Sequence, residues 1–358
     1  DPLSVASNGL LQSVYQGEPG WKTWHWKTRY NINTYNINFT VGHFDLVERT
    51  TSLLGDPLKM EFYVLKEHTY GANTLLDQAE KHLDFYTRIF GQYPWIKEKF
   101  GLVQTPYWGM EHQTINAYGN NYKNTDQGYD FLMFHEMGHE WWGNYLSASD
   151  WADFWIHEGF VVYAEAIYLE ETFGKDAYHA FFEHRMKNNI PLAHPIVPHR
   201  NATMKESGGL DPYNKGAYVL HMLRYLLGAE TMSLILREFI SVKKRLPHNQ
   251  ATTQDFIDFV HSHTNLDLNW FFNLYLYQTN LPVLNKRIKH GSNHTFVELD
   301  WENPGFKMPL EIKYYTNTGI KMKKLSLTNN PTIIPIIKQS KVEIDPMSWV
   351  LLSLSESQ

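Results

Sequence analysis

The sequence predicts an α+β protein, with a mainly helical middle region flanked by a β segment at the N-terminus and a small β-sandwich at the C-terminus. The spacing of apolar residues carries this prediction. It has the period of strands up to about residue 68, the period of helices from about 70 to 280, and the period of strands again from about 281. We therefore expect three domains, at residues 1–68, 69–280 and 281–358.

Strand signals fill the first 68 residues. Asn8-Gly9 stands between LSVAS and LLQSV, and this dipeptide is typical of a two-residue hairpin turn. The stretch NINTYNINFTV, residues 31–41, alternates Ile, Tyr and Phe with polar residues and predicts a strand. LKMEFYVLKE, residues 58–67, predicts another strand.

The middle region begins with an amphipathic helix at residues 72–91, which Gly91 is expected to end. Its apolar face would be formed by Leu75, Leu76, Ala79, Leu83, Tyr86 and Phe90. A short β segment is predicted at 100–119. Further helices are predicted at 129–145, 156–172, 175–187, 216–227, 229–244, 253–262 and 268–278.

Short strands separated by turn residues return in the last part of the chain. They are predicted at 293–301, 310–316, 323–327 and 341–345. Short antiparallel strands at this spacing are typical of a small β-sandwich.

Composition limits the possible functions. The chain has 358 residues, a formal net charge of −6 and no cysteine. Disulfides and thiolate metal sites are therefore excluded, so any metal must be bound by histidines and carboxylates. The lysines and arginines do not form a basic tract, which argues against nucleic acid as a partner. No run of about 18 apolar residues occurs, so we expect no membrane span.

The stretch HEMGHEWWGN, residues 135–144, indicates a zinc-binding helix. Positions four apart on a helix share a face, so His135 and His139 can present their imidazoles to one ion. The carboxylate of Glu136 can reach a water on that ion without binding the ion itself. Two histidine ligands with an adjacent base are typical of zinc-activated hydrolysis.

Glu158 is the candidate third ligand, nineteen positions after His139. Two His and one Glu with a water form a known catalytic zinc set. The alternative is a solvated acid at a helix N-terminus, where the helix dipole favours negative charge. We expect His157 to pack or to support a ligand. Glu165, two turns after Glu158, either orients a ligand histidine or is an exposed helix residue.

With these residues the sequence resembles the gluzincin zinc aminopeptidases, the family of aminopeptidase N and leukotriene hydrolase. Four segments carry the resemblance in the family's order: YWGMEHQT (107–114), HEMGHEWWGN (135–144), WIHEGF (155–160) and YNKGA (213–217). The resemblance covers most of the chain. It implies a thermolysin-like catalytic domain with one Zn²⁺ per chain, bound by His135, His139 and Glu158.

The resemblance also implies roles for residues outside the zinc helix. Glu111 would bind the free α-amine of a substrate, and the backbone of Gly109 and Met110 would pair with the substrate as a strand does. Tyr213 would donate its hydroxyl to the oxyanion. Taken singly, Glu111 could instead be a half-exposed strand acid, and Tyr213 could be a core aromatic residue.

The chain departs from the family pattern in two ways. His112 stands where the family usually has Asn, and Trp108 stands where it often has Gly. In addition, the family usually has a longer β domain before the catalytic domain, whereas only about 68 residues precede it here and they resemble the end of that domain. We therefore expect a chain that lacks most of the N-terminal β domain, which would be its partner in the parent protein.

The expected function is that of a zinc metallopeptidase, an aminopeptidase that hydrolyses the N-terminal peptide bond of peptides with a free N-terminus. A zinc-activated water would attack, with Glu136 as general base. A thermolysin-like endopeptidase is the nearest alternative, and the carboxylate of Glu111 argues against it. A non-catalytic fragment used for binding or scaffolding is the other alternative. The intact set of ligands and base argues against it for the parent protein, though not for this fragment.

Overall fold

The computed structural model describes residues 3–241, 249–291, 294–316, 319–337 and 342–357. The chain forms two compact units. Unit 1 comprises Asp1–Ser147 and Leu236–Gln250, and unit 2 comprises Ala148–Ile235 and Ala251–Gln358. Helices and sheets occur in both units, so the predicted α+β class, with β sheets near the N-terminus and a helical region after them, is confirmed.

A five-stranded sheet is the largest sheet described in unit 1. Its strand order is β5 (Phe44–Leu53), β6 (Asp56–Leu65), β7 (Lys99–Gln104), β9 (Asn116–Tyr118) and β8 (Gly109–Met110). β8 and β9 are antiparallel, with Gly109 opposite Tyr118. β8 therefore lies at the sheet edge, and one side of its backbone has no strand partner among the described residues.

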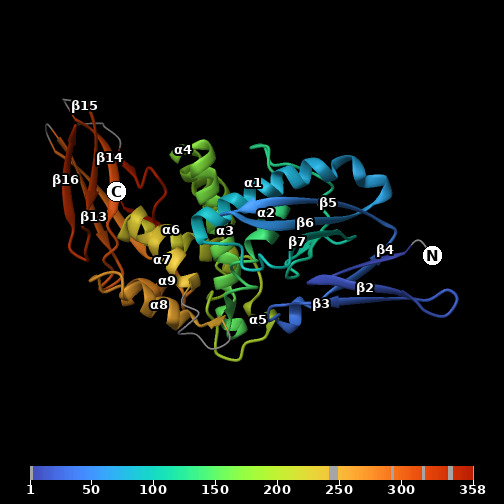
Figure 1. Ribbon diagram of the computed structural model, residues 1–358. Coiled ribbons are helices and arrows are strands. Elements are labelled where there is room, and N and C mark those ends of the chain that lie inside the picture. The colour runs from blue at the N-terminus through green and yellow to red at the C-terminus, as the bar shows by residue number, and fades with distance from the viewer. Residues whose placement is uncertain (1–2, 242–248, 292–293, 317–318, 338–341, 358) are drawn as a thin grey trace. The chain divides into compact units, whose positions relative to one another are not determined.

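Helix α1 (Ala72–Phe90) lies across this sheet in Figure 1 and contacts β5 and β6. All six residues of its predicted apolar face are buried. The predicted end is also confirmed, because Gly91 has a φ of 106° and donates its N–H to the carbonyl of Thr87. A positive φ is readily adopted by glycine and stops the helix there.

The prediction of a hairpin at Asn8-Gly9 is wrong. β1 (Ser4–Ser7) pairs with β4 (Phe39–Gly42), whereas β2 (Leu10–Gln16) pairs with β3 (Lys22–Lys27). Gly9 has the expected positive φ of 71°, but the chain passes there from one sheet to another. The dipeptide encodes the turn and not the pairing of the strands on either side.

The prediction of a strand over 31–41 is wrong in its first half. Only Phe39–Gly42 is a strand, and Thr34–Asn36 forms the 3-10 helix η1. Asn8, which lies outside this stretch, occupies backbone groups that a strand ladder would need. The amide of Asn8 donates to the carbonyl of Asn36 and its oxygen accepts the N–H of Asn38.

Helix α2 (Phe131–Gly138) is shorter than the predicted helix 129–145. The side chain of Asp130 caps its start by accepting the N–H of Met133. After the C-cap residue His139 the chain turns instead of continuing, and Gly143 has a φ of 128°, which a helix cannot contain. The two predicted ligand histidines thus lie in the last turn of α2 and at its C-cap.

Four helices assigned to unit 2 follow the prediction closely: α3 (Trp155–Phe173), α6 (Gly216–Leu227), α8 (Thr253–His261) and α9 (Asn269–Tyr275). α4 (Lys175–Ala180) is shorter than the predicted helix 175–187, and α5 (Met204–Ser207) was not predicted. α7 (Ala229–Ser241) begins as predicted, and residues 242–244 of that prediction lie outside the described residues. Single-turn segments include the π-helical η4 (Phe181–Met186) and η6 (Asp211–Lys215). Besides η1, the 3-10 turns are η2 (Lys66–Gly71), η3 (Trp151–Asp153) and η5 (Lys187–Asn189). Two short strands, β10 (Ser147–Ala148) and β11 (Gln250–Ala251), pair with each other.

Helices α3 and α6 approach each other closely at a pair of glycines. A Cβ on Gly159 would lie 2.9 Å from the carbonyl carbon of Gly216, and a Cβ on Gly216 would lie 3.1 Å from the Cα of Gly159. Because neither position has room for a side chain, the pair fixes the spacing of α3 and α6. Glu158 and Tyr213 both lie within three residues of this contact.

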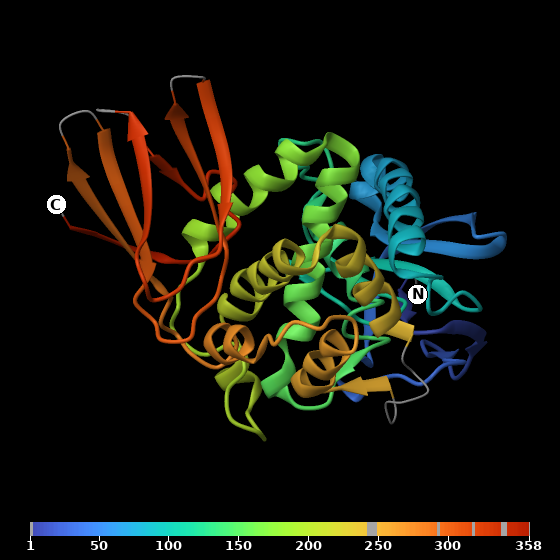
Figure 2. The same ribbon diagram turned by 90° about the vertical axis from the view of Figure 1, so that its left-hand side faces the viewer.

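Two sheets follow the helices and lie next to one another in Figure 2, in orange and red. One contains β16 (Thr332–Ile337), β13 (His294–Trp301), β12 (Val283–His290) and β18 (Ser353–Ser357); the other contains β15 (Gly319–Leu325), β14 (Leu310–Thr316) and β17 (Val342–Ile344). The expectation of antiparallel strands fails at one pair, because β18 runs parallel to β12. In the part of the chain that the structure describes, no helix has the length and apolarity needed to cross a membrane.

Candidate active site

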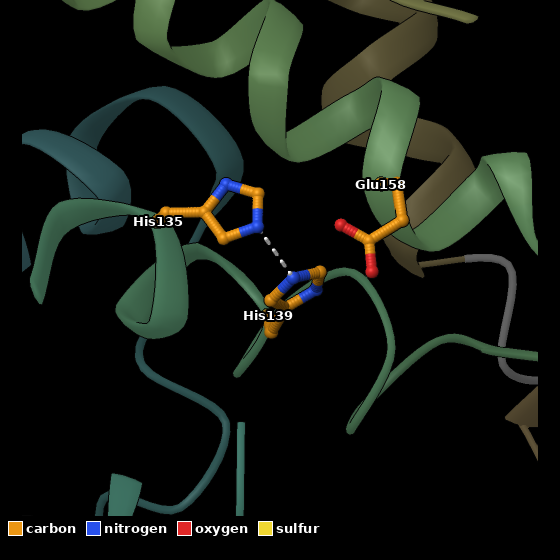
Figure 3. A group of neighbouring side chains, drawn as sticks. All are labelled: His135, His139 and Glu158. Atoms are coloured by element: carbon orange, nitrogen blue, oxygen red, sulfur yellow. Dashed lines mark hydrogen bonds between the residues drawn. The ribbon is translucent and has the colours of Figure 1, made fainter. Parts of the chain in front are cut away.

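Two histidines of the α2 segment face one another. Nε2 of His135 and Nε2 of His139 are 3.2 Å apart (Figure 3). The carbonyl of Trp142 lies 2.9 Å from Nδ1 of His139, and because a carbonyl only accepts, Nδ1 carries the proton and Nε2 keeps its lone pair. Two nitrogens at a zinc–nitrogen distance of about 2.05 Å in a tetrahedral site are about 3.3 Å apart, so the pair fits such an ion.

Glu158 lies in the first turn of α3 and is 3% exposed. One carboxylate oxygen of Glu158 and one ring nitrogen of each histidine lie within 4.8 Å of one another (Figure 3). The structure therefore brings the three predicted ligands together in a group that could hold a metal ion. Two imidazoles and one carboxylate are ligands that suit zinc.

A second group shares His139 and includes both predicted substrate-facing acids. Ligand atoms of Glu111, Glu136 and His139 lie within 4.8 Å of one another, and both glutamates are 7% exposed. Two carboxylates this close repel each other in a buried place unless a cation or a proton lies between them. The arrangement favours a positively charged ligand, either a metal ion or an ammonium group.

The backbone of β8 passes directly beside Glu136. A Cβ on Gly109 would lie 2.6 Å from Cδ1 of Leu132 and even closer to Oε1 of Glu136, so a larger residue would have to displace these two side chains. Gly109 and Met110 are half-buried at the sheet edge. The predicted binding strand and the predicted base are therefore neighbours.

Tyr35 is a neighbour of Glu111 that sequence reasoning missed. Its hydroxyl donates to Oε1 of Glu111 at 3.3 Å, across a separation of 76 residues. The error follows from the interpretation of residues 31–41 as a strand. An alternating pattern does not show that Tyr35 lies in a 3-10 turn beside another segment.

Glu140 is a second residue that was missed. It is fully buried, and its two oxygens accept four hydrogen bonds. The donors are the indole of Trp95, the N–H of Thr114 and the side-chain amides of Asn116 and Asn144. Burial raises the pKa of Glu140 to about 7 and outweighs these four bonds, which lower it. The only sequence signal that could have pointed to Glu140 was its position next to His139.

Asn144 connects this network to the predicted amine anchor. Its side-chain amide donates to the carbonyl of Glu111 at 3.0 Å and to Glu140 at 3.1 Å. Its oxygen accepts the side-chain amide of Asn36. Asn144 therefore holds the backbone of Glu111 in place from the segment that follows His139.

The two positions that depart from the family pattern also differ in environment. Burial lowers the pKa of His112 to about 4, so this imidazole is neutral at neutral pH and can stand in for a neutral polar side chain. Trp108, in contrast, is 60% exposed.

Tyr213 lies in η6, with its ring 6.3 Å from the ring of Phe154. Two buried side chains hold this turn. Asp211 accepts the N–H groups of residues 192–194, and Nζ of Lys215 donates to the carbonyl of Gln278 at 2.6 Å. Burial lowers the pKa of Lys215 to about 8.

The two accessory residues of α3 are both buried. His157 is 3% exposed, which agrees with the expected packing, and its Nε2 accepts the N–H of Ala148 at 2.8 Å. The interpretation of Glu165 as an exposed helix residue is wrong, since it is 1% exposed and bonds Arg185 at 2.5 Å.

Solved structures share this fold. Legionella pneumophila aminopeptidase A, in complex with aspartic acid, superposes with a TM-score of 0.79 at 16% identity, over 99% of this chain and 43% of that chain. A mutant of a two-domain M1 zinc metallopeptidase bound to L-tryptophan superposes with a TM-score of 0.66 at 21% identity, over 78% of this chain and 62% of that chain.

Curated proteins are also similar to this chain in sequence. Aminopeptidase N of Escherichia coli (strain K12) is 26% identical over 309 residues, which are 78% of this chain and 34% of the relative. Endoplasmic reticulum aminopeptidase 1 of Mus musculus is 26% identical over 250 residues, 64% of this chain and 26% of the relative. The chain thus spans about a third or less of these two proteins. The family model described as the peptidase family M1 domain matches residues 74–275, more than half of the chain, and the chain therefore belongs to peptidase family M1.

Proposed function

We propose that this protein is a zinc aminopeptidase, with one Zn²⁺ per chain, that removes the first residue from peptides with a free N-terminus. The observation that carries the proposal is the convergence of Glu111, Glu136 and His139 within 4.8 Å. Membership of peptidase family M1 supports it. Residues 69–280 would be a thermolysin-like catalytic domain, between the end of a β domain at 1–68 and a β-sandwich at 281–358.

His135, His139 and Glu158 would hold the zinc ion. The spacing of the two Nε2 atoms and the tautomer of His139 support this assignment, as does the lack of cysteine. A zinc ion in this place supplies Lewis acidity, which polarises a carbonyl and makes a water acidic near neutral pH.

Glu136 would act as the general base. Its carboxylate takes a proton from the attacking water and returns it to the nitrogen of the leaving peptide. The contact between Gly109 and Glu136 supports this role, because a peptide lying along β8 brings its scissile bond to this carboxylate.

Glu111 would bind the α-ammonium group, while the backbone of Gly109 and Met110 pairs with the peptide. Burial makes a charged hydrogen bond between a carboxylate and an ammonium strong. Tyr213 would donate its hydroxyl to the oxyanion that forms when water adds to the carbonyl. A phenol suits this task because it donates without carrying a charge.

A thermolysin-like endopeptidase is disfavoured by Glu111. An endopeptidase binds the interior of a peptide, which presents a neutral amide at this position and leaves the buried carboxylate without a counter-charge. A non-catalytic role in binding or scaffolding would not require Glu136 beside the histidine pair.

The test compares one peptide with a free N-terminus and its N-acetylated copy. The protein should release the first residue from the free peptide and leave the acetylated copy intact. Glu111→Ala should lower kcat/KM for the free peptide by on the order of 10²-fold or more, because it removes one partner of a buried charge pair. Glu67→Ala, at an exposed glutamate of the same unit, is the matched control and should change nothing.

The outcomes separate the alternatives. Cleavage of both peptides at the same internal bond would overturn the aminopeptidase assignment in favour of an endopeptidase. Failure of the zinc-loaded protein to cleave either peptide would favour the non-catalytic role.

A further inference from the structure

Three aromatic side chains lie beside the candidate site and have no part in the proposed chemistry. Tyr107 and Trp108 directly precede β8, and Phe131 is the first residue of α2. Tyr107 is 46% exposed and Trp108 is 60% exposed, while Phe131 is half-buried. We refer to these three residues as the aromatic shelf.

Ring contacts connect the shelf to the histidine pair. The rings of Trp108 and Phe131 are 6.1 Å apart between centroids, and the rings of Phe131 and His135 are 5.6 Å apart. Burial, with a contribution from the charge of Glu136, raises the pKa of the Tyr107 phenol. The shelf therefore borders both His135 and Glu136.

The backbone of the shelf is held in place. The hydroxyl of Thr105 donates to the carbonyl of Tyr107 at 2.8 Å, and the N–H of Gly119 donates to the carbonyl of Trp108 at 2.7 Å. The cap of α2 at Asp130 fixes the start of the helix that carries Phe131. The backbone that carries the shelf is thus preformed, so a bound side chain need not order it.

The order of residues along the chain assigns the shelf to one part of a bound peptide. Along the chain, Tyr107 and Trp108 precede β8 in a bend, Gly109 lies in β8 beside Glu136, and Glu111 follows β8. A peptide whose amine is at Glu111 reaches Glu136 with its first peptide bond, since each strand residue advances about 3.3 Å. Its second residue then lies beside Trp108 and Tyr107.

From this arrangement, and resting on the function proposed above, we infer that the aromatic shelf binds the side chain of the substrate's second residue and selects peptides with an aromatic or large apolar residue there. Trp108 is the main determinant because it is the largest and most exposed of the three rings. An aromatic partner on these rings gains burial and ring contacts.

The charges around the shelf give the order of preference. The shelf itself is neutral, and the nearest charged groups named above are the carboxylates of Glu136 and Glu111. An acidic second residue gains no aromatic contact and has to bring its carboxylate out of water beside neutral rings. The expected order of kcat/KM is therefore aromatic or large apolar first, Gly next, and Asp last.

The test uses one first residue that the protein accepts, offered as its amide and as dipeptides ending in Phe, Gly or Asp. The amide releases ammonia and has no second residue, so it reports the chemistry without the shelf. The wild-type protein should prefer the Phe dipeptide over the Gly dipeptide by about tenfold in kcat/KM, which corresponds to about 1.4 kcal/mol. Trp108→Gly should remove most of this preference and change cleavage of the amide less than about twofold.

Two further variants control the experiment. Trp108→Phe should keep most of the preference, since it keeps an aromatic ring. Trp21→Gly, at a tryptophan that is 71% exposed and lies between β2 and β3, should leave the preference unchanged.

Equal cleavage of the Phe and Gly dipeptides by the wild-type protein would overturn the inference, and so would a Trp108→Gly variant that retains the preference. Cleavage of the amide in either case would leave the aminopeptidase function standing. If the amide and all dipeptides stay intact, the proposed function fails and the inference fails with it.

Discussion

The segments 135–144 and 31–38 both contribute residues near Glu111. Only the contacts of the first segment could be predicted from the sequence. In HEMGHEWWGN, the contact between His135 and His139 follows from four residues of helix. In NINTYNIN, Tyr35 and Asn36 contact Glu111 and Asn144 across 76 and 108 residues. Helix geometry fixes the first contact, whereas the second exists only after the fold has formed.

The two segments also differ in what they do. The α2 segment provides groups with their own chemistry, a pair of imidazoles and a carboxylate. The asparagine-rich segment provides neutral hydrogen bonds that hold the backbone and carboxylate of Glu111. We therefore expect substitutions in the first segment to change kcat strongly, and substitutions in the second to change substrate binding and stability by smaller factors.

The largest effect is expected for Glu136→Gln. The variant should lose kcat by roughly 10²-fold or more, because a general base is removed while the amide keeps the size of the side chain. Zinc content should stay at one per chain by metal analysis, since no ligand is changed. His139→Ala is the contrasting variant and should lose zinc. Near-normal kcat in Glu136→Gln, or full zinc occupancy in His139→Ala, would break the assignment of roles within α2.

Tyr213→Phe tests whether a residue outside both segments can act on kcat as strongly as Glu136. Removal of one hydroxyl should lower kcat on the order of 10²-fold if the phenol stabilises the oxyanion. The melting temperature and zinc content should hardly change. A lower melting temperature with normal kcat would instead identify Tyr213 as a core aromatic residue.

Asn144→Ala addresses the connection between the two segments. It leaves the carbonyl of Glu111 and the amide of Asn36 without their partner, which costs about 1–3 kcal/mol of stability. KM for a free-amine peptide should rise by about tenfold, with a smaller change in kcat. Asn33→Ala is the control, because Asn33 bonds Ser147 and not the Glu111 segment. Equal effects of the two substitutions on KM would show that Asn144 does not position Glu111.

Tyr35→Phe should give the smallest effect, a rise in KM of about two- to fivefold at unchanged kcat. The hydroxyl donates to Glu111 at 3.3 Å, and a hydrogen bond of this kind contributes about 0.5–1 kcal/mol. Tyr30→Phe, in the same segment but bonded to the N–H of Lys97, is the matched control. A change in kcat as large as that of Tyr213→Phe would show that Tyr35 takes part in the chemistry.

The limits of sequence interpretation follow the same division. The bounds of α1, α3 and α6 could be predicted, because amphipathic period and terminal glycines are local signals. The length of α2 could not, since Gly143 and the turns after His139 end it early. The pairing of β1 with β4 and the parallel pair β12–β18 join distant segments, and periodicity says nothing about such pairs.

The site shows the same limit. The spacing of His135, Glu136, His139 and Glu158 suggested four of the side chains that gather, and the resemblance to the family suggested Glu111. The buried acceptor Glu140 could not be inferred, because its four donors come from three separate stretches of chain. Nor could Tyr35. The role of Glu140 or Tyr35 becomes clear only from its hydrogen-bond partners, and most of these partners are distant in the sequence.

The proposed recognition of an ammonium group at Glu111 has a consequence over time. Each cleavage would leave a shorter peptide whose new first residue carries the same charge, so the product would again be a substrate. Nothing in this contact measures the length of the peptide. Trimming would continue one residue after another and slow only where the side chain that reaches Tyr107 and Trp108 is a poor fit. A time course on a long peptide would then give a ladder of fragments whose longest-lived members have an acidic second residue.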